Sequence, residues 1–255
     1  MRVTTTATLS GPLGDGRVEG LTLPIAAEWD GRTRFAVNRS CAALSLGRLA
    51  AAGLVLSDAR LPLCPVDGGL VVLDGARLGG GMALNAVHLA GRMGEAPVTL
   101  AAERAELRLG ERRFRLAAPA VRIGAGAETT HLRFATVDGR FDGVPAGGFT
   151  GGGGAIANVP LVMSAADGTW ALRDGRLVVG GALMVADAAE APRFVPLAGR
   201  DVALTLAGGR IAVSGRLVHP DKGIFVSDVS IVHDLGSGAG HADLAVPGIT
   251  FDKAF

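Results

Sequence analysis

The sequence contains no tyrosine, and aromatic residues make up only 4% of its 255 positions. Sites for carbohydrates and single-stranded nucleic acids usually stack the ligand on aromatic side chains, so both ligand classes are disfavoured. Neither sign of charge is in excess, because 25 Lys and Arg face 24 Asp and Glu and leave a net charge of +1. Such a chain has little electrostatic attraction for polyanions. We therefore expect no nucleic-acid partner.

Cysteine is scarce as well. Cys41 and Cys64 are too few for a disulfide framework, and their spacing fits no zinc-binding pattern. Two free, packed thiols are the favoured interpretation, and a single disulfide is the alternative in an oxidising compartment. No metal and no cofactor is expected.

A long, uninterrupted apolar segment is also missing. The longest uncharged run, from Gly143 to Ala166, contains seven Gly and two Pro, a composition that predicts a loop rather than a membrane-spanning helix. The N-terminal segment MRVTTTATLSG has no continuous apolar stretch behind its single Arg. We therefore expect neither a signal peptide nor an anchor helix within this chain.

Helical periodicity is nearly absent, and alternation with a period of two replaces it. In VALTLAGGRIAVSGRLV the aliphatic residues alternate with small or polar ones, which is typical of strands. Half of the Asp residues precede Gly, and Asp-Gly favours tight hairpin turns. We predict an all-β chain of about 12 to 16 strands that pair antiparallel through short turns. One domain over residues 1–255 is expected, and the run from Gly147 to Gly154 is either a seam or a flexible loop.

One face of the predicted sheet is aliphatic. In the C-terminal half, the residues expected to share this face are Leu177, Val179, Leu183, Val185, Leu204, Leu206, Ile211, Val213 and Leu217. A one-sided sheet must bury its apolar face against a second layer. Since few helices are expected, the sheet could form a sandwich, close into a barrel or curl around an apolar ligand. Composition does not choose among these three.

Four segments between Trp170 and Asp252 form a specific combination: GGALMVAD, PRFVPL, LTLAGGRIAVSG and HDLGSGAGHADLAVPGITFD. A fifth segment, LSDARLPLCP, lies further upstream. This part of the sequence resembles YdbH-type proteins, relatives of AsmA and TamB in the Gram-negative cell envelope.

The resemblance implies a long, curved antiparallel sheet, half-rolled into an open groove with an apolar concave face. It implies a non-enzymatic conduit that carries phospholipid or another acyl lipid between the inner and outer membranes. It also implies a periplasmic location, with an inner-membrane anchor in a part that this chain does not contain. The nine aliphatic residues would then line the lipid groove. The alternative is a structural β-sandwich or solenoid, a scaffold or adhesion module, which holds no lipid.

Catalytic side chains gather in one place, the segment VHDLGSGAGHADL. It contains His233, Asp234, Ser237, His241 and Asp243. GSGAG is not the nucleophile elbow G-x-S-x-G, and the two histidines lack the i, i+4 spacing of a zincin pair. A Gly-rich hairpin with polar ends is the favoured interpretation, and we expect no enzyme.

A basic segment, GERRFRL, runs from Gly110 to Leu116. It could form a patch for acidic headgroups. The favoured interpretation is that Arg113 and Arg115 occupy the solvated face of an edge or outer strand, where charges also discourage aggregation.

Overall fold

The computed structural model describes residues 1–13, 16–51, 53–126, 129–220, 226–234 and 239–246. These residues form twenty β-strands and no helix, so no helix among them is long and apolar enough to cross a membrane. Strand occupies 75% of the chain, and the prediction of an all-β, antiparallel architecture is confirmed. The predicted number of strands is too low, because seven strands have only three to five residues. Segments that short show no measurable alternation.

The chain divides into two compact units, Met1–Thr129 and Thr130–Phe255. The N-terminal unit contains β1 (Arg2–Leu13), β2 (Gly16–Trp29), β3 (Arg34–Val37), β4 (Ala42–Ala51), β5 (Leu54–Val66), β6 (Val71–Asp74), β7 (Arg77–Gly79), β8 (Gly81–Met93), β9 (Ala96–Arg108), β10 (Arg113–Ala117) and β11 (Ala120–Ile123). The C-terminal unit contains β12 (Thr130–Arg133), β13 (Thr136–Arg140), β14 (Ala146–Ala155), β15 (Leu161–Arg173), β16 (Arg176–Asp187), β17 (Leu197–Ala207), β18 (Arg210–Val218), β19 (Val226–Asp234) and β20 (Gly240–Ala245).

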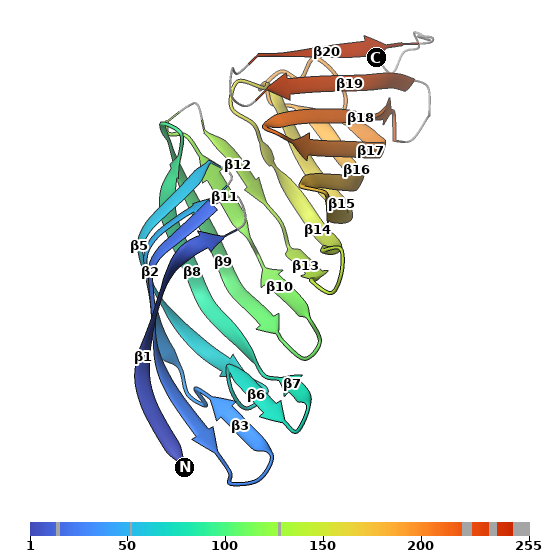
Figure 1. Ribbon diagram of the computed structural model, residues 1–255. Coiled ribbons are helices and arrows are strands. Elements are labelled where there is room, and N and C mark those ends of the chain that lie inside the picture. The colour runs from blue at the N-terminus through green and yellow to red at the C-terminus, as the bar shows by residue number, and fades with distance from the viewer. Residues whose placement is uncertain (14–15, 52, 127–128, 221–225, 235–238, 247–255) are drawn as a thin grey trace. The chain divides into compact units, whose positions relative to one another are not determined.

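Strand neighbours in space are mostly neighbours in sequence (Figure 1). In the N-terminal unit the main ladder runs β1-β2-β4-β5-β8-β9, and β9 then pairs with both β10 and β11. A branch of β3, β6 and β7 pairs with the end of β2. In the C-terminal unit β12 and β13 both pair with β14, and an antiparallel meander continues from β14 to β20. Short Asp-Gly turns suit this arrangement because they reverse the chain between adjacent strands.

The glycine-rich run is a strand, which corrects the expected seam or loop. Gly147 and Gly154 lie within β14, and the two units divide instead between Thr129 and Thr130. A Cβ atom at Gly147 would clash with the carbonyl oxygen of Asp138, and one at Gly154 with that of His131. Neighbouring backbones therefore approach β14 so closely that only glycine fits. The uncharged run from Gly143 to Ala166 is also mostly strand, in β14 and β15, and not the expected loop.

The two cysteines are joined, which corrects the expectation of free thiols. Ala42 of β4 lies opposite Leu63 of β5, and the same register places Cys41 opposite Cys64. Their Cα atoms are 4.0 Å apart, and a disulfide links them. The sequence alone does not reveal this register, because the segment between the two cysteines, which are 23 positions apart, holds two strands and a turn whose lengths decide it.

The buried apolar residues lie almost entirely in the N-terminal unit. Ten of the eleven found among the described residues belong to it, and only Leu197 belongs to the C-terminal unit. In the N-terminal unit one cross-strand row runs through Val18, Leu49, Leu56, Gly91, Val98 and Ile123. Side chains directly opposite each other on paired strands share a face and pack together. The C-terminal unit must therefore be stabilised without a comparable dry interior.

Candidate functional site

The nine aliphatic residues predicted to share a face lie in cross-strand rows on β16, β17 and β18. One row is Leu177, Leu206 and Ile211, and a second is Val179, Leu204 and Val213. Leu183 and Leu217 flank Gly199 in a third, and Val185 lies opposite Leu197. Because directly opposite residues in an antiparallel ladder point to the same side, the structure brings all nine together. We call this set the aliphatic face.

Two bulges keep the rows aligned. β15 has one extra residue between Ser164 and Asp167, and β17 has one between Arg200 and Ala203. Ala165 and Asp201, at these two places, have φ of 48° and 51°. Beyond a bulge, the residues that face a given side of the sheet change from odd to even numbers or the reverse, and the strand bends at that place. In β17, Leu197 and Gly199 thus share the aliphatic face with residues of even number beyond the bulge.

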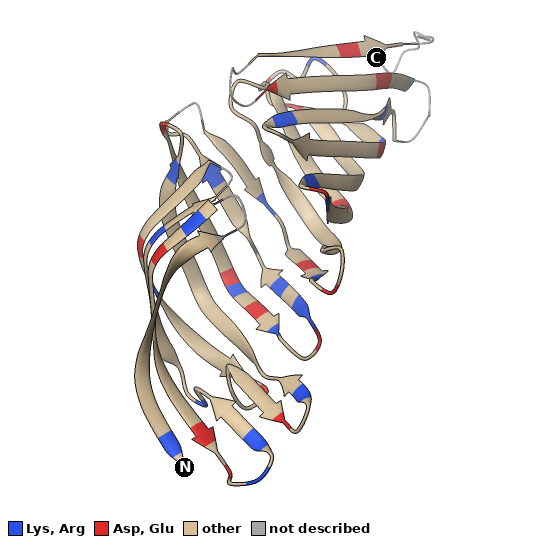
Figure 2. Cartoon of the chain, viewed as in Figure 1, with Lys and Arg blue, Asp and Glu red and all other residues tan. Residues whose placement is uncertain are grey.

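The aliphatic face is only half-buried. All nine residues have intermediate exposure, whereas several of their neighbours on the opposite face are exposed, among them Ala182, Ala203 and Ala212. Figure 2 shows that long stretches of the strands in the C-terminal unit carry no charged residue. Within the described residues no second layer of strands covers these rows. The aliphatic face therefore has partial access to solvent or to a bound molecule.

An aromatic ring of β14 lies on the same side of the sheet, beside the aliphatic face. Phe149 lies opposite Gly168, which lies opposite Gly181. A Cβ at Gly168 would come within 2.7 Å of the Phe149 ring, so the ring rests on the glycine. Phe134 meets Phe149 edge to face, with ring centroids 5.6 Å apart, a favourable aromatic geometry. The glycines here make room for a neighbouring ring.

Three residues that the sequence interpretation did not assign extend the rows. Trp170 lies opposite Val179, Ile231 lies opposite Val213, and Leu197 lies opposite Val185. The alternation of Trp170 with Leu172 before the Asp-Gly turn is the signal that could have identified the first. Leu197 follows a proline-containing loop, so no alternation precedes it.

Asp187 and Arg193 form an ion pair at the end of β16, close to Val185, and we call this pair the clamp. The carboxylate of Asp187 accepts hydrogen bonds from Nε and Nη2 of Arg193 at 2.6 and 2.9 Å, and from the backbone N–H groups of Arg193 and Ala189. The side chain of Asp187 is fully buried. The guanidinium hydrogen bond, followed by the Arg193 N–H and opposed by burial, holds the pKa of Asp187 well below its usual range. This clamp orders the connection that leads into β17.

The polar cluster singled out in the sequence lies on the hairpin of β19 and β20. His233 lies opposite Gly240, whereas His241 lies opposite Val232, so the two histidines point to opposite faces of the sheet. His241 is within 3.9 Å of Asp243, and both are exposed. Ser237 lies outside the described residues. No group of three or more potential metal ligands is found among those that are described.

A shallow, open depression of about 380 Å³ lies on the His241 side of this hairpin. Arg210, Val232, Asp234 and His241 line it together with backbone of Ala239 and Gly240. Its polar lining lies on the face opposite to Ile211 and Ile231. It is therefore separate from the aliphatic face.

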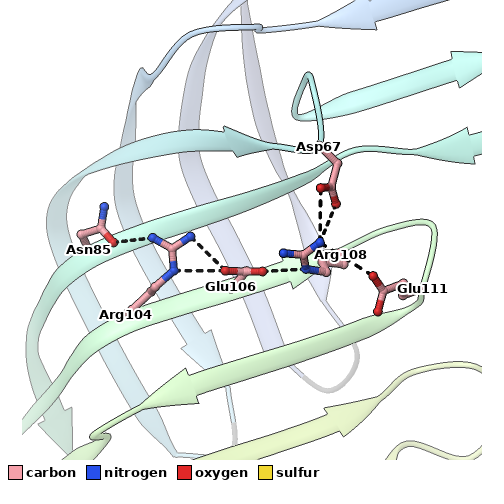
Figure 3. A network of polar contacts seen from close by, with 6 residues as sticks. All are labelled: Asp67, Asn85, Arg104, Glu106, Arg108 and Glu111. Carbon is pink, nitrogen blue, oxygen red and sulfur yellow. Dashed lines mark hydrogen bonds and ion pairs between the residues drawn. The ribbon is translucent and has the colours of Figure 1, made fainter.

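Charged side chains form a network along β9 of the N-terminal unit (Figure 3). Glu106 accepts hydrogen bonds from Arg104 and Arg108, at 2.9 and 2.7 Å, and Arg108 also pairs with Asp67. The Arg104 hydrogen bond, opposed by partial burial and assisted by Arg108, lowers the pKa of Glu106. Arg113 and Arg115 of β10 lie opposite Arg108 and Glu106 and are exposed. The side chains of Arg113 and Arg115 are thus solvated, as the sequence analysis favoured.

Comparison of the chain with protein-family models, curated proteins and solved structures finds no match.

Proposed function

We propose that the chain is a non-enzymatic lipid conduit module of the Gram-negative cell envelope, and that the aliphatic face holds the acyl chains of phospholipid. One observation carries the proposal. Nine aligned aliphatic side chains on three consecutive strands are only half-buried, and no second layer covers them among the described residues. An apolar surface of this kind gains free energy when an apolar molecule displaces its water.

The energetics suit an acyl chain. Burial stabilises a methylene group by about 0.8 kcal/mol, so a chain of about sixteen carbons gains roughly 12 kcal/mol on leaving water. A path that carries such a chain must offer dry contact along its whole length. One row crosses β15 to β19 without a charged residue and supports this part of the proposal. It runs through Trp170, Val179, Leu204, Val213 and Ile231.

The disulfide supports a location outside the cytosol. Disulfides persist in oxidising compartments such as the bacterial periplasm and are rare in the cytosol. The Cys41–Cys64 bond therefore agrees with the periplasmic location that the family resemblance implies.

Leu206→Asp tests the proposal. Leu206 lies in the middle of a row between Leu177 and Ile211, so the carboxylate is placed where an acyl chain lies. An unpaired charge in an apolar, water-free site costs several kcal/mol, but water solvates it once the lipid leaves. We expect the variant to fold and to lose at least most of the phospholipid that copurifies with the unchanged protein.

Ala203→Asp is the matched control, because Ala203 is on the same strand but on the opposite, exposed face. It should retain both fold and lipid. The measurements are organic extraction with mass spectrometry and a thermal melt of each variant. Global unfolding of Leu206→Asp alone indicates a closed structural sandwich, and an unchanged lipid content for both variants rules out the aliphatic face as the lipid site.

A further inference from the structure

In the part of the chain that the structure describes, β1 pairs with β2 alone, and its other, open edge has the pattern of a self-pairing strand. β1 pairs with β2 in one constant register from Arg2 opposite Glu28 to Leu9 opposite Leu21. All of its residues from 2 to 10 are exposed. It is twelve residues long and has neither Lys nor a bulge before Leu9. Long edge strands without charges or bulges pair readily with another strand.

The hydrogen-bond phase tells which residues face the open edge. The amine of Met1 donates to the Trp29 carbonyl, and the Trp29 N–H donates to the Met1 carbonyl, each at 2.9 Å. Antiparallel ladders alternate between bonded and non-bonded pairs, so the odd residues of β1 bond to β2. The backbone of Ala26, opposite Thr4, bonds instead to Asn38 on its other side, as this phase requires. The N–H and C=O groups of Thr4, Thr6 and Thr8 therefore point to the open edge.

We propose that this edge pairs with the β1 edge of a second copy of the chain, antiparallel and centred on Thr6. In that register Thr4 of one copy faces Thr8 of the other, and Thr6 faces itself. The ladder thus contains three such pairs, because the pairing of Thr4 with Thr8 occurs twice. In each pair the backbone groups of both residues point to the open edge, so the two residues exchange two hydrogen bonds. The odd residues then meet as close, non-bonded pairs, with Val3 facing Leu9.

The side chains agree with a second copy as the occupant. Val3 and Leu9 are 48% and 58% exposed, and the proposed register covers each with the other. Threonines pair with threonines on the opposite face, a favourable cross-strand combination. Arg2, the only charged residue of β1, lies opposite Ser10, so the two like charges are at opposite ends of the ladder. A partner strand of unrelated sequence has no reason to satisfy all three conditions.

Pairing would also join two apolar surfaces. Leu9 and Ala7 lie opposite Leu21 and Leu23 of β2, so the odd residues of β1 continue an aliphatic surface of the N-terminal unit. Antiparallel pairing in an even register keeps odd residues on one side of the combined sheet. The dimer thus carries one apolar surface across both copies. This inference does not depend on bound lipid.

Cysteine cross-linking tests the register. Thr6→Cys should form a covalent dimer under mild oxidation, because paired Cα atoms are about 5.5 Å apart, within the range of a disulfide. Thr8→Cys is the matched control on the same edge, and its two sulfurs would be separated by roughly 13 Å of strand. It should cross-link only when mixed with Thr4→Cys. Equal cross-linking of Thr6→Cys and Thr8→Cys contradicts the register.

Proline substitutions test the edge itself. Thr6→Pro removes an N–H that faces the open edge, so the monomer should keep its fold, while dimer dissociation measured by sedimentation shifts to at least about tenfold higher concentration. Thr5→Pro removes an N–H that bonds to β2 and should destabilise the fold. If the unchanged chain sediments as a monomer at every concentration, or if Thr6→Pro leaves the dimer intact, the proposal is wrong.

Discussion

Asn38 completes a ladder with its side chain, and its replacement should be costly. β2 pairs with β3 from Ala27 to Trp29 and with β4 up to Thr22, which leaves Pro24 and Ala26 between the two partners. Oδ1 of Asn38 accepts from the Ala26 N–H at 2.6 Å, and Nδ2 donates to the Pro24 carbonyl at 2.7 Å. Asn38 is only 3% exposed, so water does not easily replace these bonds.

The magnitude follows from two separate effects. Asn38→Ala leaves two partly buried backbone groups without their side-chain partner, each at a cost of about 1 kcal/mol, the low end for such groups. Asn38 also has a φ of 46°, and alanine tolerates the left-handed region worse than asparagine, by about 1 kcal/mol. We expect Asn38→Ala to lower the free energy of unfolding of the N-terminal unit by about 3 kcal/mol in total.

Asn158→Ala separates the two effects. Asn158 has a φ of 61° but is exposed, so its replacement retains the backbone cost of about 1 kcal/mol and removes the buried-bond cost. Urea unfolding followed by circular dichroism measures both variants against the unchanged protein. The loss for Asn38→Ala should exceed that for Asn158→Ala by about 2 kcal/mol. Equal losses would refute the role of Asn38 as a substitute strand partner.

Two further predictions concern acid and reduction. Because the folded-state pKa of Asp187 is lowered, its carboxylate stabilises the fold above the unfolded-state pKa of about 3.9, and this stabilisation is lost progressively as the pH falls below that value. Asp187→Asn should therefore be less stable than the unchanged protein at neutral pH, and in urea melts it should lose less stability than the unchanged protein between neutral pH and pH 3. Equal losses of stability for the two proteins over this pH range would contradict the prediction. The Cys41–Cys64 bond closes a loop with a sequence separation of 23, so dithiothreitol should lower the free energy of unfolding by about 3 kcal/mol and have no effect on a variant with both cysteines replaced by alanine.

The alternation of the sequence predicts strands and faces well where a strand is regular. In β16, Leu177, Val179, Leu183 and Val185 are spaced by even numbers, and the structure places them on one side. The same holds for Ile211, Val213 and Leu217 of β18. These assignments succeed because side-chain direction in a regular strand depends only on the position along the chain.

Register and bulges are not encoded in such a local pattern. Leu197 and Leu204 share a face although they differ in parity, because β17 carries an extra residue near Asp201. In the N-terminal unit, Leu56 and Leu63 of β5 are both buried although they also differ in parity, and Asp58 between them has a φ of 52°. The position of the extra or left-handed residue is fixed by pairing with the neighbouring strands, and a pattern within one strand contains no information on that pairing. The disulfide depends on the same information.

The distribution of glycine in the C-terminal unit indicates on which side its sheet is concave. Side chains crowd on the inner side of a bend, so small residues are needed there. A Cβ at Gly199 or Gly215 would come within 3.3 and 3.2 Å of Cγ2 of Val202, and Gly168 is covered by Phe149 in the same way.

These glycines lie at the level of the bulges in β15 and β17, where bulged strands bend. Leu183, Gly199 and Leu217 form one row at that level, so the crowded side is the aliphatic face. A sheet that bends toward its aliphatic side shields these residues in part without a second layer. Curvature of this kind explains how all nine can be half-buried.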